Sequence, residues 1–369
     1  MPADGWQALT GADNPFASHA FHAALEDSGC VGTGTGWMPR HLTLEADGQL
    51  IGALPLFAKH DSFGEFVFDW AWADAWQQAG RNYYPKLVAA VPFSPVGAPT
   101  LLTHPGAEEI GIADSLIDAA LARVADESLS SLHLLFIDDA IADRLAARNF
   151  ILREDCQFHW HNDGFRDFDD FLARFRSAKR KEVRRERRQV AQSGLTLRRH
   201  PGSTVDHALW DALHALTARS FYLRGSTPYL NAAAFRALGT QLGDAMQAFV
   251  AWNGDEPVAC ALCVQSTDAL YGRYWGACEE VPGLHFELCY YQGIEYCIER
   301  GLLRFEPGAQ GEHKLARGFD PVRTRSAHWI ADSALRAPVD DWCRRERDFT
   351  KRYLAAAARH RPYHRGDPA

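Results

Sequence analysis

A stretch late in the chain gathers side chains that can bind a ligand or move a proton. It reads Phe-Glu-Pro-Gly-Ala-Gln-Gly-Glu-His-Lys-Leu-Ala-Arg-Gly-Phe over residues 305–319 and follows the short apolar strand 302–305. Loops at the ends of buried strands are where α/β proteins place much of their chemistry. A structural turn needs the glycines and the proline but not this density of charge. We therefore predict a functional loop, with a solvated turn as the alternative. Its polar side chains are Gln310, Glu312, His313, Lys314 and Arg317.

A basic helix is predicted near the middle of the chain. Residues 168–175 carry an apolar stripe at helical spacing, and residues 179–188 hold seven basic and two acidic side chains in a chain whose net charge is −8. One interpretation is a solvated face crossed by i,i+4 ion pairs. The other is a phosphate-binding face for a nucleotide, a lipid pyrophosphate, CoA or a tRNA. The second interpretation would use Arg180, Lys181 and Arg184.

Two further segments place polar groups among aromatic ones. Arg273 shares a strand face with Tyr271 and Trp275 by the strand period of two. Such an arginine is either a stacked structural residue or one that faces a ligand. The other segment contains Lys86 and is followed by three prolines within residues 91–99, which cannot continue a central strand. It is predicted to be a rigid loop that serves as a structural staple or as the wall of a substrate site.

The composition limits the class of protein. The 369 residues allow two domains, and 47% hydrophobic with 23% charged residues predict a well-buried core. The net charge of −8 argues against a general binder of nucleic acid or membrane surfaces. No apolar run approaches the ~20 residues that span a bilayer, and the N-terminus lacks the basic start and apolar core of a signal peptide. We expect a cytoplasmic protein without a membrane span.

The cysteines are expected to be structural. Cys260 and Cys263 have C-x-x-C spacing, but they lie in the apolar run 258–264, which predicts a buried strand. A strand directs residues three apart to opposite faces, so core thiols are favoured over a redox pair or half of a zinc site. No set of His, Cys and Asp residues has metal-ligand spacing, and no metal is predicted.

The order of predicted elements repeats in the two halves of the chain. Asp47-Gly48 and Asn253-Gly254 each lie between apolar runs, which is a strong signal for a β-hairpin. In the first half the predicted strands are 40–45, 50–57 and 66–72, followed by a helix over 107–127 and a strand over 132–137. In the second half they are 248–252, 257–264 and 270–275, followed by a helix over 284–300 and a strand over 302–305. A meander, a helix and a strand, occurring twice, is the order of the GNAT acyltransferase fold in tandem.

The motifs resemble those of a known family, the FemAB/FemX-like branch of the GNAT superfamily. The resemblance covers the basic helix with 193–197, the string Tyr-Gly-Arg-Tyr-Trp-Gly at 271–276, and the Lys…Gly-Phe segment 314–319. Tyr-Gly-Arg-Tyr-Trp-Gly and Gly-Ala-Gln-Gly-Glu-His-Lys resemble the hallmark strings of an uncharacterised subfamily of N-acyltransferases. Residues 95–99 are similar to the Pro-Arg-Gly-Pro loop of the first domain in FemX-like proteins, but Val96 stands where that loop has arginine.

The resemblance implies a fold and a reaction. The fold would be α/β with two tandem GNAT-like (acyl-CoA N-acyltransferase-like) domains, residues 1–160 and 161–369, with a C-terminal helix over about 339–358 packed on the first. The reaction would form an amide by acyl transfer to an amine, as the FemX-like relatives do with an aminoacyl-tRNA donor and a peptidoglycan precursor. It names neither the donor nor the acceptor, and the oligomeric state stays open.

Acyl transfer to an amine assigns roles to the polar residues. A base must take the proton of the amine, for which Glu312, His313, Glu287 and Glu306 are candidates. A cation must stabilise the oxyanion or bind the phosphate of the donor, for which Lys314, Arg273 and Arg317 are candidates. His313 has the alternative of a structural histidine. We take Glu312, His313 and Lys314 as the candidate catalytic residues. The candidate substrate-binding residues are Asp69, Lys86, Tyr271, Arg273, Tyr274, His285, Glu287, Gln310 and Arg317.

The donor is predicted partly from what a loop lacks. GNAT enzymes that use acetyl-CoA place a glycine-rich loop before the helix, where backbone N–H groups bind the pyrophosphate. Here residues 278–283 read Cys-Glu-Glu-Val-Pro-Gly, whose carboxylates suit pyrophosphate poorly. We therefore favour an aminoacyl-tRNA donor, keep acyl-CoA as the alternative, and expect no tightly bound cofactor. A pair of GNAT domains that binds RNA or a partner protein without catalysis is the third interpretation.

Overall fold

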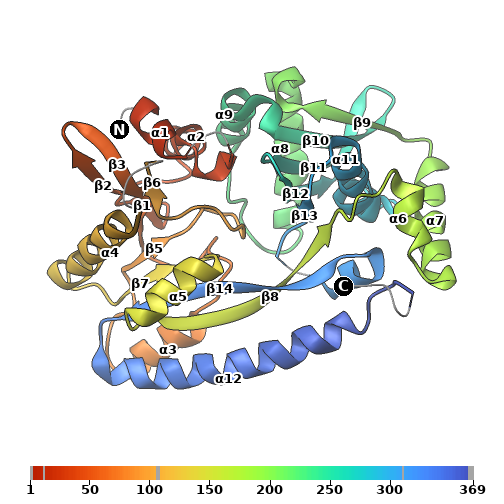
Figure 1. Cartoon of the computed structure of the whole chain (residues 1–369). Helices are drawn as coiled ribbons and strands as arrows, with labels where there is room; N and C mark the ends of the chain where they lie inside the picture. The colour runs from red at the N-terminus through yellow and green to blue at the C-terminus, as the bar shows by residue number, and fades with distance from the viewer. Residues whose placement is uncertain (1–2, 11–12, 105–108, 310, 365–369) are drawn as a thin grey trace. The chain divides into compact units, whose positions relative to one another are not determined.

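The chain forms two compact units, which are described separately. The computed structural model describes residues 3–10, 13–104, 109–309 and 311–364 (Figure 1). Unit 1 comprises Met1–Cys156 and Arg323–Tyr353, and unit 2 comprises Gln157–Val322 and Leu354–Ala369. The chain passes from one unit to the other within β8 (Ile151–His161), β14 (Asp320–Ile330) and α12 (Ser333–Ala358). Residues 323–353 thus lie in unit 1, which a single division near residue 160 does not anticipate.

Unit 1 is built on a mixed sheet. Its strands follow the order β1-β4-β5-β7-β14, with β5 and β7 parallel and the other pairs antiparallel. A smaller antiparallel sheet has the order β2-β3-β6. The strands first named here are β1 (Trp37–Pro39), β2 (Leu42–Ala46), β3 (Gln49–Leu54), β4 (Phe57–Lys59), β5 (Lys86–Ala89), β6 (Leu102–Thr103) and β7 (Ser131–Leu134). The helices are α1 (Ala3–Thr10), α2 (His19–Asp27), α3 (Trp70–Gln78), α4 (Glu109–Asp126) and α5 (Asp139–Ala147), with a 3-10 turn at Pro15–Ala17.

Helix α4 joins the parallel strands β5 and β7 and fills the core of unit 1. Ile112, Leu116 and Ile117 pack with strand residues such as Leu87 and Leu132, all of them buried. On α12, Val339 and Cys343 join a second buried cluster that includes Trp72 and Trp76 of α3. The N-terminal part of α12 is therefore held against unit 1 by apolar burial, the main favourable term in folding.

One strand predicted in unit 1 is a loop and a helix instead. Residues 66–69 form a loop, and α3 begins at Trp70. The alternation of Phe66, Phe68, Trp70 and Trp72 imitates a strand, but the buried tryptophans of α3, Trp72 and Trp76, lie four residues apart, which is the helical period. The strand that precedes the helix–strand crossover is β5, so the first-half meander was predicted wrongly at this point.

Unit 2 contains the second copy of the strand–helix–strand order. The strand order is β9-β10-β11-β12-β13 followed by the end of β8, and β12 is parallel to β13. The strands are β9 (Thr196–Pro201), β10 (Met246–Asn253), β11 (Glu256–Gln265), β12 (Ala269–Ala277) and β13 (Arg304–Glu306). The helices are α6 (Phe168–Ala173), α7 (Ser177–Ala191), α8 (His207–Tyr222), α9 (Ala232–Leu242), α10 (Leu284–Phe286), the π-helix η4 (Glu287–Tyr291) and α11 (Gln292–Arg300). Three 3-10 turns complete the unit: η2 (Gly202–Thr204), η3 (Gly243–Ala245) and η5 (Glu312–Arg317).

Both predicted hairpins are confirmed. β2 and β3 pair antiparallel around Asp47 and Gly48, whose φ angles are 51° and 76°, and β10 pairs with β11 across Gly254 with φ 60°. Positive φ at the centre of a two-residue turn matches the right-handed twist of the strands, which is why Asp-Gly and Asn-Gly are favoured there.

Strands β12 and β13 separate after their last paired residues. The last pair is Tyr271 with Glu306, and β12 then continues to Ala277, still paired with β11 on its other side, while β13 ends at Glu306. A Cβ at Gly272 would lie 3.1 Å from Pro307, and one at Gly276 would lie 2.2 Å from Leu216 of α8. The two glycines of the 271–276 motif thus allow the turn after β13 and α8 to approach β12 closely.

No helix within the described residues is long and apolar enough to cross a bilayer.

Candidate functional site

Lys314 lies where the parallel strands of unit 2 separate. It belongs to η5, is 2% exposed, and its Nζ donates a hydrogen bond to the carbonyl oxygen of Gly308 at 2.6 Å. Among the residues that the structure describes, no carboxylate lies within ion-pair distance of this Nζ. Burial lowers the pKa of Lys314 to about 7, with Cys289 opposing the shift. Lys314 is therefore a buried amine that is poised to change charge near neutral pH.

Neutral imidazoles and aromatic rings surround this lysine. Tyr290 and His313 are joined by a hydrogen bond of 2.7 Å between the phenol oxygen and Nε2. The His285 ring meets the rings of Trp275, Tyr290 and His313 edge to face at 5.1, 5.5 and 6.3 Å. Burial, assisted by His313, lowers the pKa of His285 to about 4, and burial with Lys314 lowers that of His313. Both histidines are therefore neutral at pH 7 and can exchange hydrogen bonds without adding charge.

A buried ion pair joins the loop to the basic helix. Arg317 donates to Glu186 of α7 at 2.7 Å, and its guanidinium lies 3.4 Å from the centroid of the Phe286 ring. The Tyr291 hydroxyl also donates to Glu186. The adjacent residues Tyr290 and Tyr291 both lie in the π-helix η4, and their hydroxyls bond to different partners, His313 and Glu186. Short π-helical segments of this kind are frequent at functional sites. Glu186 carried no signal in the sequence, since it reads as one acid within a charged run.

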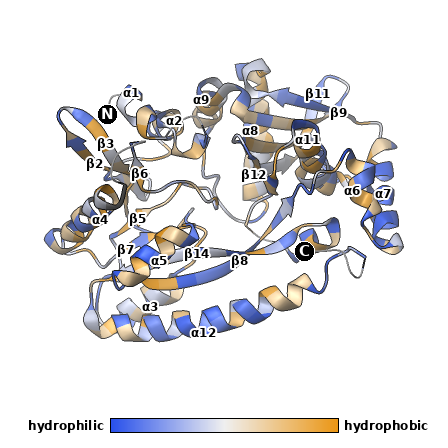
Figure 2. Cartoon of the chain, in the orientation of Figure 1, coloured by the Kyte–Doolittle hydropathy of each residue, from blue (hydrophilic) through white to orange (hydrophobic). Residues whose placement is uncertain are grey.

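The basic helix α7 divides into a bonded and an unbonded part. Arg187 pairs with both Glu287 and Glu295, so Glu287 is neutralised by the helix rather than free as a base. Arg184 pairs with Asp169. Within the described part of the chain, four basic side chains of this helix have no ion-pair partner: Arg180, Lys181, Arg185 and Arg188. Figure 2 shows α7 mostly in the hydrophilic colours. The ion pairs support part of the solvated-face interpretation, and the unpaired side chains leave a cationic face.

Three further predicted residues of unit 2, Tyr271, Arg273 and Tyr274, lie along β12. Tyr271 is buried, and its hydroxyl accepts a hydrogen bond from Arg304 at 3.0 Å. The guanidinium of Arg273 lies 5.4 Å from the Tyr274 ring, beyond the last pair with β13. Glu312 is exposed at the start of η5. Gln310 lies outside the described residues.

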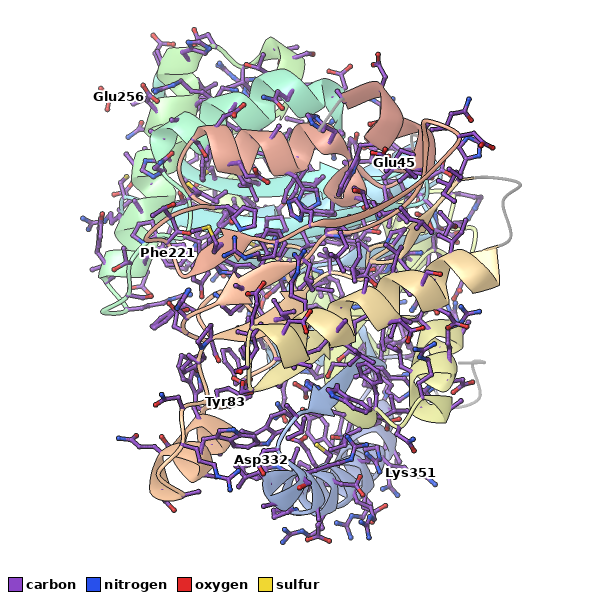
Figure 3. The ribbon with its side chains drawn as sticks, turned by 90° about the vertical axis from the view of Figure 1, so that its left-hand side faces the viewer. Glu45, Tyr83, Phe221, Glu256, Asp332 and Lys351 are labelled. Carbon is purple, nitrogen blue, oxygen red and sulfur yellow. The ribbon has the colours of Figure 1, made fainter. Side chains whose placement is uncertain are left out.

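Lys86 and Asp69 lie in unit 1 and form a buried charge cluster there. Lys86 Nζ, fully buried, donates to Glu65 at 2.9 Å, to Ser62 at 3.0 Å and to Asp69. Tyr83, labelled in Figure 3, donates to Asp69 and packs against Trp76 of α3. Burial raises the pKa of Glu65 to about 7, against the pull of Lys86. These contacts satisfy Lys86 and Asp69 without a ligand, and their role in substrate binding stays a prediction.

Glu306 and His159 complete the polar groups around the separating strands. Glu306 is 7% exposed, and burial raises its pKa to about 7, although Arg304 donates to it at 3.0 Å. His159 of β8 lies 4.0 Å from the other carboxylate oxygen. The sequence did not single out His159, because residues 157–161 show the alternation of polar and apolar residues that is typical of an ordinary strand. A carboxylate and an amine that both titrate near neutrality are the kind of pair that general acid–base chemistry uses.

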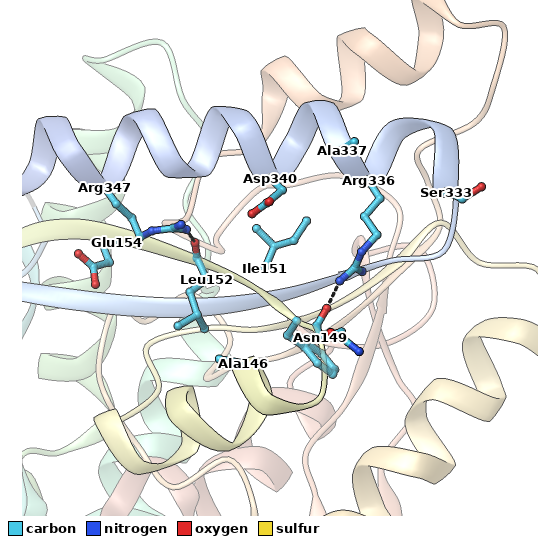
Figure 4. A pocket seen from close by; sticks show the side chains of 11 residues that line it. Ala146, Asn149, Ile151, Leu152, Glu154, Ser333, Arg336, Ala337, Asp340 and Arg347 are labelled. Atoms are coloured by element: carbon cyan, nitrogen blue, oxygen red, sulfur yellow. Dashed lines mark hydrogen bonds between the residues drawn. The ribbon is translucent and has the colours of Figure 1, made fainter.

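The cysteines and a pocket of unit 1 lie apart from this chemistry. Cys260 and Cys263 are buried as predicted, and burial raises the pKa of both. Within the described residues no three His, Cys, Asp or Glu side chains gather as a metal site requires. A cavity of about 610 Å³ lies between α12 and the segment 146–154. Its arginines, Arg336 and Arg347, donate to the backbone oxygens of Asn149 and Leu152 (Figure 4), and it contains none of the predicted site residues.

Comparison with known proteins places the chain in a family. A family described as peptidoglycan biosynthesis/recognition, FemAB-like, matches residues 1–365. Among solved structures, FemX is 12% identical over 92% of this chain and 97% of its own, with a TM-score of 0.55. L-PGS from Bacillus licheniformis is 11% identical over 90% and 98%, with a TM-score of 0.52. A conserved protein of unknown function from Bacteroides thetaiotaomicron is 9% identical over 89% and 97%, with a TM-score of 0.53.

No curated protein matches the sequence. At such low identity the solved structures speak for the fold alone, which is α/β as predicted and is similar to that of FemX over most of the chain. The match of the family runs over nearly the full length of the chain. The protein is a member of the FemAB-like family.

Proposed function

We propose that the protein is an N-acyltransferase that forms an amide bond between an activated acyl or aminoacyl donor and an amine. The observation that carries this proposal is Lys314, a buried amine without a carboxylate partner among the described residues, set where β12 and β13 separate. Membership of the FemAB-like family supports acyl transfer, and its description supports an acceptor amine on a peptidoglycan precursor.

Lys314 suits the stabilisation of the tetrahedral intermediate. When the amine attacks, negative charge develops on the carbonyl oxygen of the donor, and a cation already fixed in a dry site stabilises that charge without reorganising. Lys314 is held in place by its bond to Gly308, and the neutral histidines beside it do not compete for the oxyanion. His313 and Tyr290 orient the loop, while Arg317 ties it to α7.

An aminoacyl ester of tRNA fits the surroundings better than acyl-CoA. The start of α10, where a CoA pyrophosphate would bind, follows the exposed Glu279 and Glu280, and a Cβ at Gly283 would lie 3.2 Å from the backbone oxygen of Glu186. These groups repel an anion. The cationic face of α7 offers a phosphate backbone an alternative place to bind. Use of charged tRNA implies a cytoplasmic enzyme with no tightly bound cofactor.

A donor screen tests the function. The purified protein is incubated with a mixed pool of aminoacyl-tRNAs or with acetyl-CoA, together with a lysine-containing peptidoglycan precursor, and the acceptor is analysed by mass spectrometry. We expect a mass increase of one aminoacyl residue with the tRNA pool. Transfer from acetyl-CoA alone would support the second enzyme interpretation, and binding of tRNA without any product would support a non-catalytic pair.

The face of α7 makes a separate prediction about donor binding. Reversing Arg180, Lys181 and Arg184 to glutamate should weaken tRNA binding and make it less dependent on salt, by about 0.7–0.9 in the slope of log K against log salt for each lost phosphate contact. Fluorescence anisotropy of labelled tRNA measures both the affinity and its dependence on salt. The titrations cover about 50 to 200 mM salt, where contacts with phosphates dominate binding. The matched control reverses Arg345, Lys351 and Arg352 on exposed positions of α12. An equal loss in both variants would reduce α7 to a generic surface charge.

A further inference from the structure

Glu306 has an unusual environment for a carboxylate. It is the last residue of β13 and the last to pair with β12, so it lies at the point where the two strands separate. The residue is 7% exposed. Its Oε1 accepts a hydrogen bond from Arg304 Nε at 3.0 Å. The chain then turns, and two residues later Gly308 accepts the hydrogen bond of Lys314. Glu306 and Lys314 are therefore attached to the same turn.

The second oxygen of Glu306 is free to take a proton. Within the described residues, Oε2 has no hydrogen-bond donor, and His159 Nε2 lies 4.0 Å from it. That imidazole nitrogen already lies 3.0 Å from the amide oxygen of Gln157. A nearly buried carboxylate oxygen without a donor is expensive to leave ionised. Such an oxygen has a strong tendency to accept a proton from whatever group approaches it.

The charges that face Glu306 come from four elements. Arg304 on its own strand favours the ionised form, Asp268 before β12 opposes it, and the burial that dominates raises the pKa to about 7. Tyr271 of β12 is uncharged, since burial raises its pKa above the ordinary value. Burial, with His161, Arg304 and Lys314, lowers the pKa of His159 of β8 to about 3, so it is neutral at pH 7. Glu306 is thus expected to change charge near neutral pH.

We propose that Glu306 is the proton acceptor for the amine substrate. This inference rests on the proposed function and selects one residue among the candidate bases. The exposed Glu312 and the paired Glu287 lack the buried, donor-free oxygen that Glu306 has. The acceptor class that follows is an alkylamine, which is an ammonium ion at pH 7 and cannot attack until it loses a proton.

The proton and electron movements balance for an ester or a thioester donor. The ammonium substrate gives one proton to Glu306 Oε2, and the freed lone pair forms the C–N bond to the acyl carbon. The oxyanion forms beside Lys314. The second proton leaves the nitrogen as the bond between the acyl carbon and the leaving oxygen or sulfur breaks, and the leaving group takes it. Glu306 returns its proton to solvent.

Glu306→Gln with two acceptors tests the role. Nα-acetyl-lysine carries an ammonium at pH 7, whereas hydroxylamine is already neutral and needs no base. Using the donor that the wild type accepts, with the reaction lacking enzyme subtracted, we expect Glu306→Gln to lower kcat/KM for Nα-acetyl-lysine by about 10²–10⁴-fold, the range for a lost general base. The rate with hydroxylamine should change by less than about tenfold. The wild-type rate with Nα-acetyl-lysine should fall as pH drops below 7, and the variant should lose this limb.

Asp268→Asn is the matched control. It removes the other carboxylate bound to Arg304, at 2.6 Å, and leaves the Glu306 carboxylate in place. Because Asp268 opposes the ionisation of Glu306, this variant should keep activity with both acceptors while its acid limb moves to lower pH. A Glu306→Gln enzyme that loses both acceptors equally, or keeps both, overturns the role of Glu306 while the transfer activity of the wild type stands. A wild type that transfers to neither acceptor from either donor overturns the proposed function itself.

A folding measurement checks the environment of Glu306 without any substrate. The folded pKa of about 7 lies above the ordinary pKa of 4.5 for a glutamate, so between these values the folded state holds a proton that the unfolded chain has lost. The free energy of unfolding should therefore fall as pH rises from 4.5 to 7. Glu306→Gln should flatten that fall, and Asp268→Asn should retain most of it. An unchanged slope in Glu306→Gln would contradict the nearly buried carboxylate, with one oxygen lacking a donor, on which the proposal depends.

Discussion

Replacing Lys314 by methionine should lower turnover by about 10²–10³-fold, the range for losing one preorganised electrostatic contact with the oxyanion. The side chain keeps its length and apolar stem but loses the cation. Initial rates with the donor and acceptor identified in the screen measure the effect, with KM expected to change less than kcat. Because protonated Lys314 is the active form, the wild-type rate should also fall as pH rises through about 7.

The fold should tolerate this substitution for a reason that differs from ordinary surface lysines. Lys314 is buried without a carboxylate partner among the described residues, and replacing such a charge by an apolar group is neutral or stabilising. Its folded pKa of about 7 lies below the ordinary pKa of 10.5 for a lysine, so the free energy of unfolding should rise with pH between these values. Lys314→Met should lack that rise. A variant that stays fully active would place the chemistry elsewhere, and one that unfolds would make Lys314 structural.

Lys86→Met should destabilise unit 1 by about 3–5 kcal/mol, the range for removing one partner of a buried ion pair. Lys86 is fully buried and is shared by the carboxylates of Glu65 and Asp69, which are themselves about 2% exposed. Without Lys86, both carboxylates lose their cation in a place that water does not reach. Urea or thermal unfolding followed by circular dichroism measures the loss.

Two further variants separate a structural role of Lys86 from a substrate contact. Lys86→Met combined with Glu65→Gln and Asp69→Asn removes the stranded charges and should recover part of the lost stability. Lys351→Met, on the exposed surface of α12 (Figure 3), should change stability by no more than about 0.5 kcal/mol. If Lys86→Met behaved like Lys351→Met while substrate binding fell, Lys86 would belong to a binding site instead of the core.

The sequence predicted elements well where local chemistry decides the structure. The two glycine turns at Gly48 and Gly254 and the basic helix are specified by residues that lie next to one another. Residues 66–72 were misread because aromatic side chains alternate there while the burial that decides the matter comes from Val339 and Cys343, far along the chain. Local pattern cannot contain that information.

The candidate site shows the same limit more sharply. The loop with His313 and Lys314 was found because its charges are adjacent in sequence. The burial of Lys314 could not be predicted from the loop, because burial depends on segments distant in sequence; Tyr290 and Phe286, which contact the His313 ring, come from the crossover helix. The partner of Arg317, Glu186, lies 131 residues away. Electrostatic environment depends on such distant partners, so the pKa of Lys314 could not be read from the loop alone.

Because the chain passes between the two units more than once, unit 1 cannot complete its fold early during synthesis on the ribosome. Ala327 and Val339, which lie in the buried clusters of unit 1, are synthesised after the whole of residues 157–322. Unit 1 must therefore wait, with part of its apolar surface uncovered, while unit 2 emerges and folds. Uncovered apolar surface and unpaired strand edges favour aggregation during synthesis. A fragment ending at residue 156 should need a chaperone or precipitate, and neither unit can be obtained as a single uninterrupted piece of the gene.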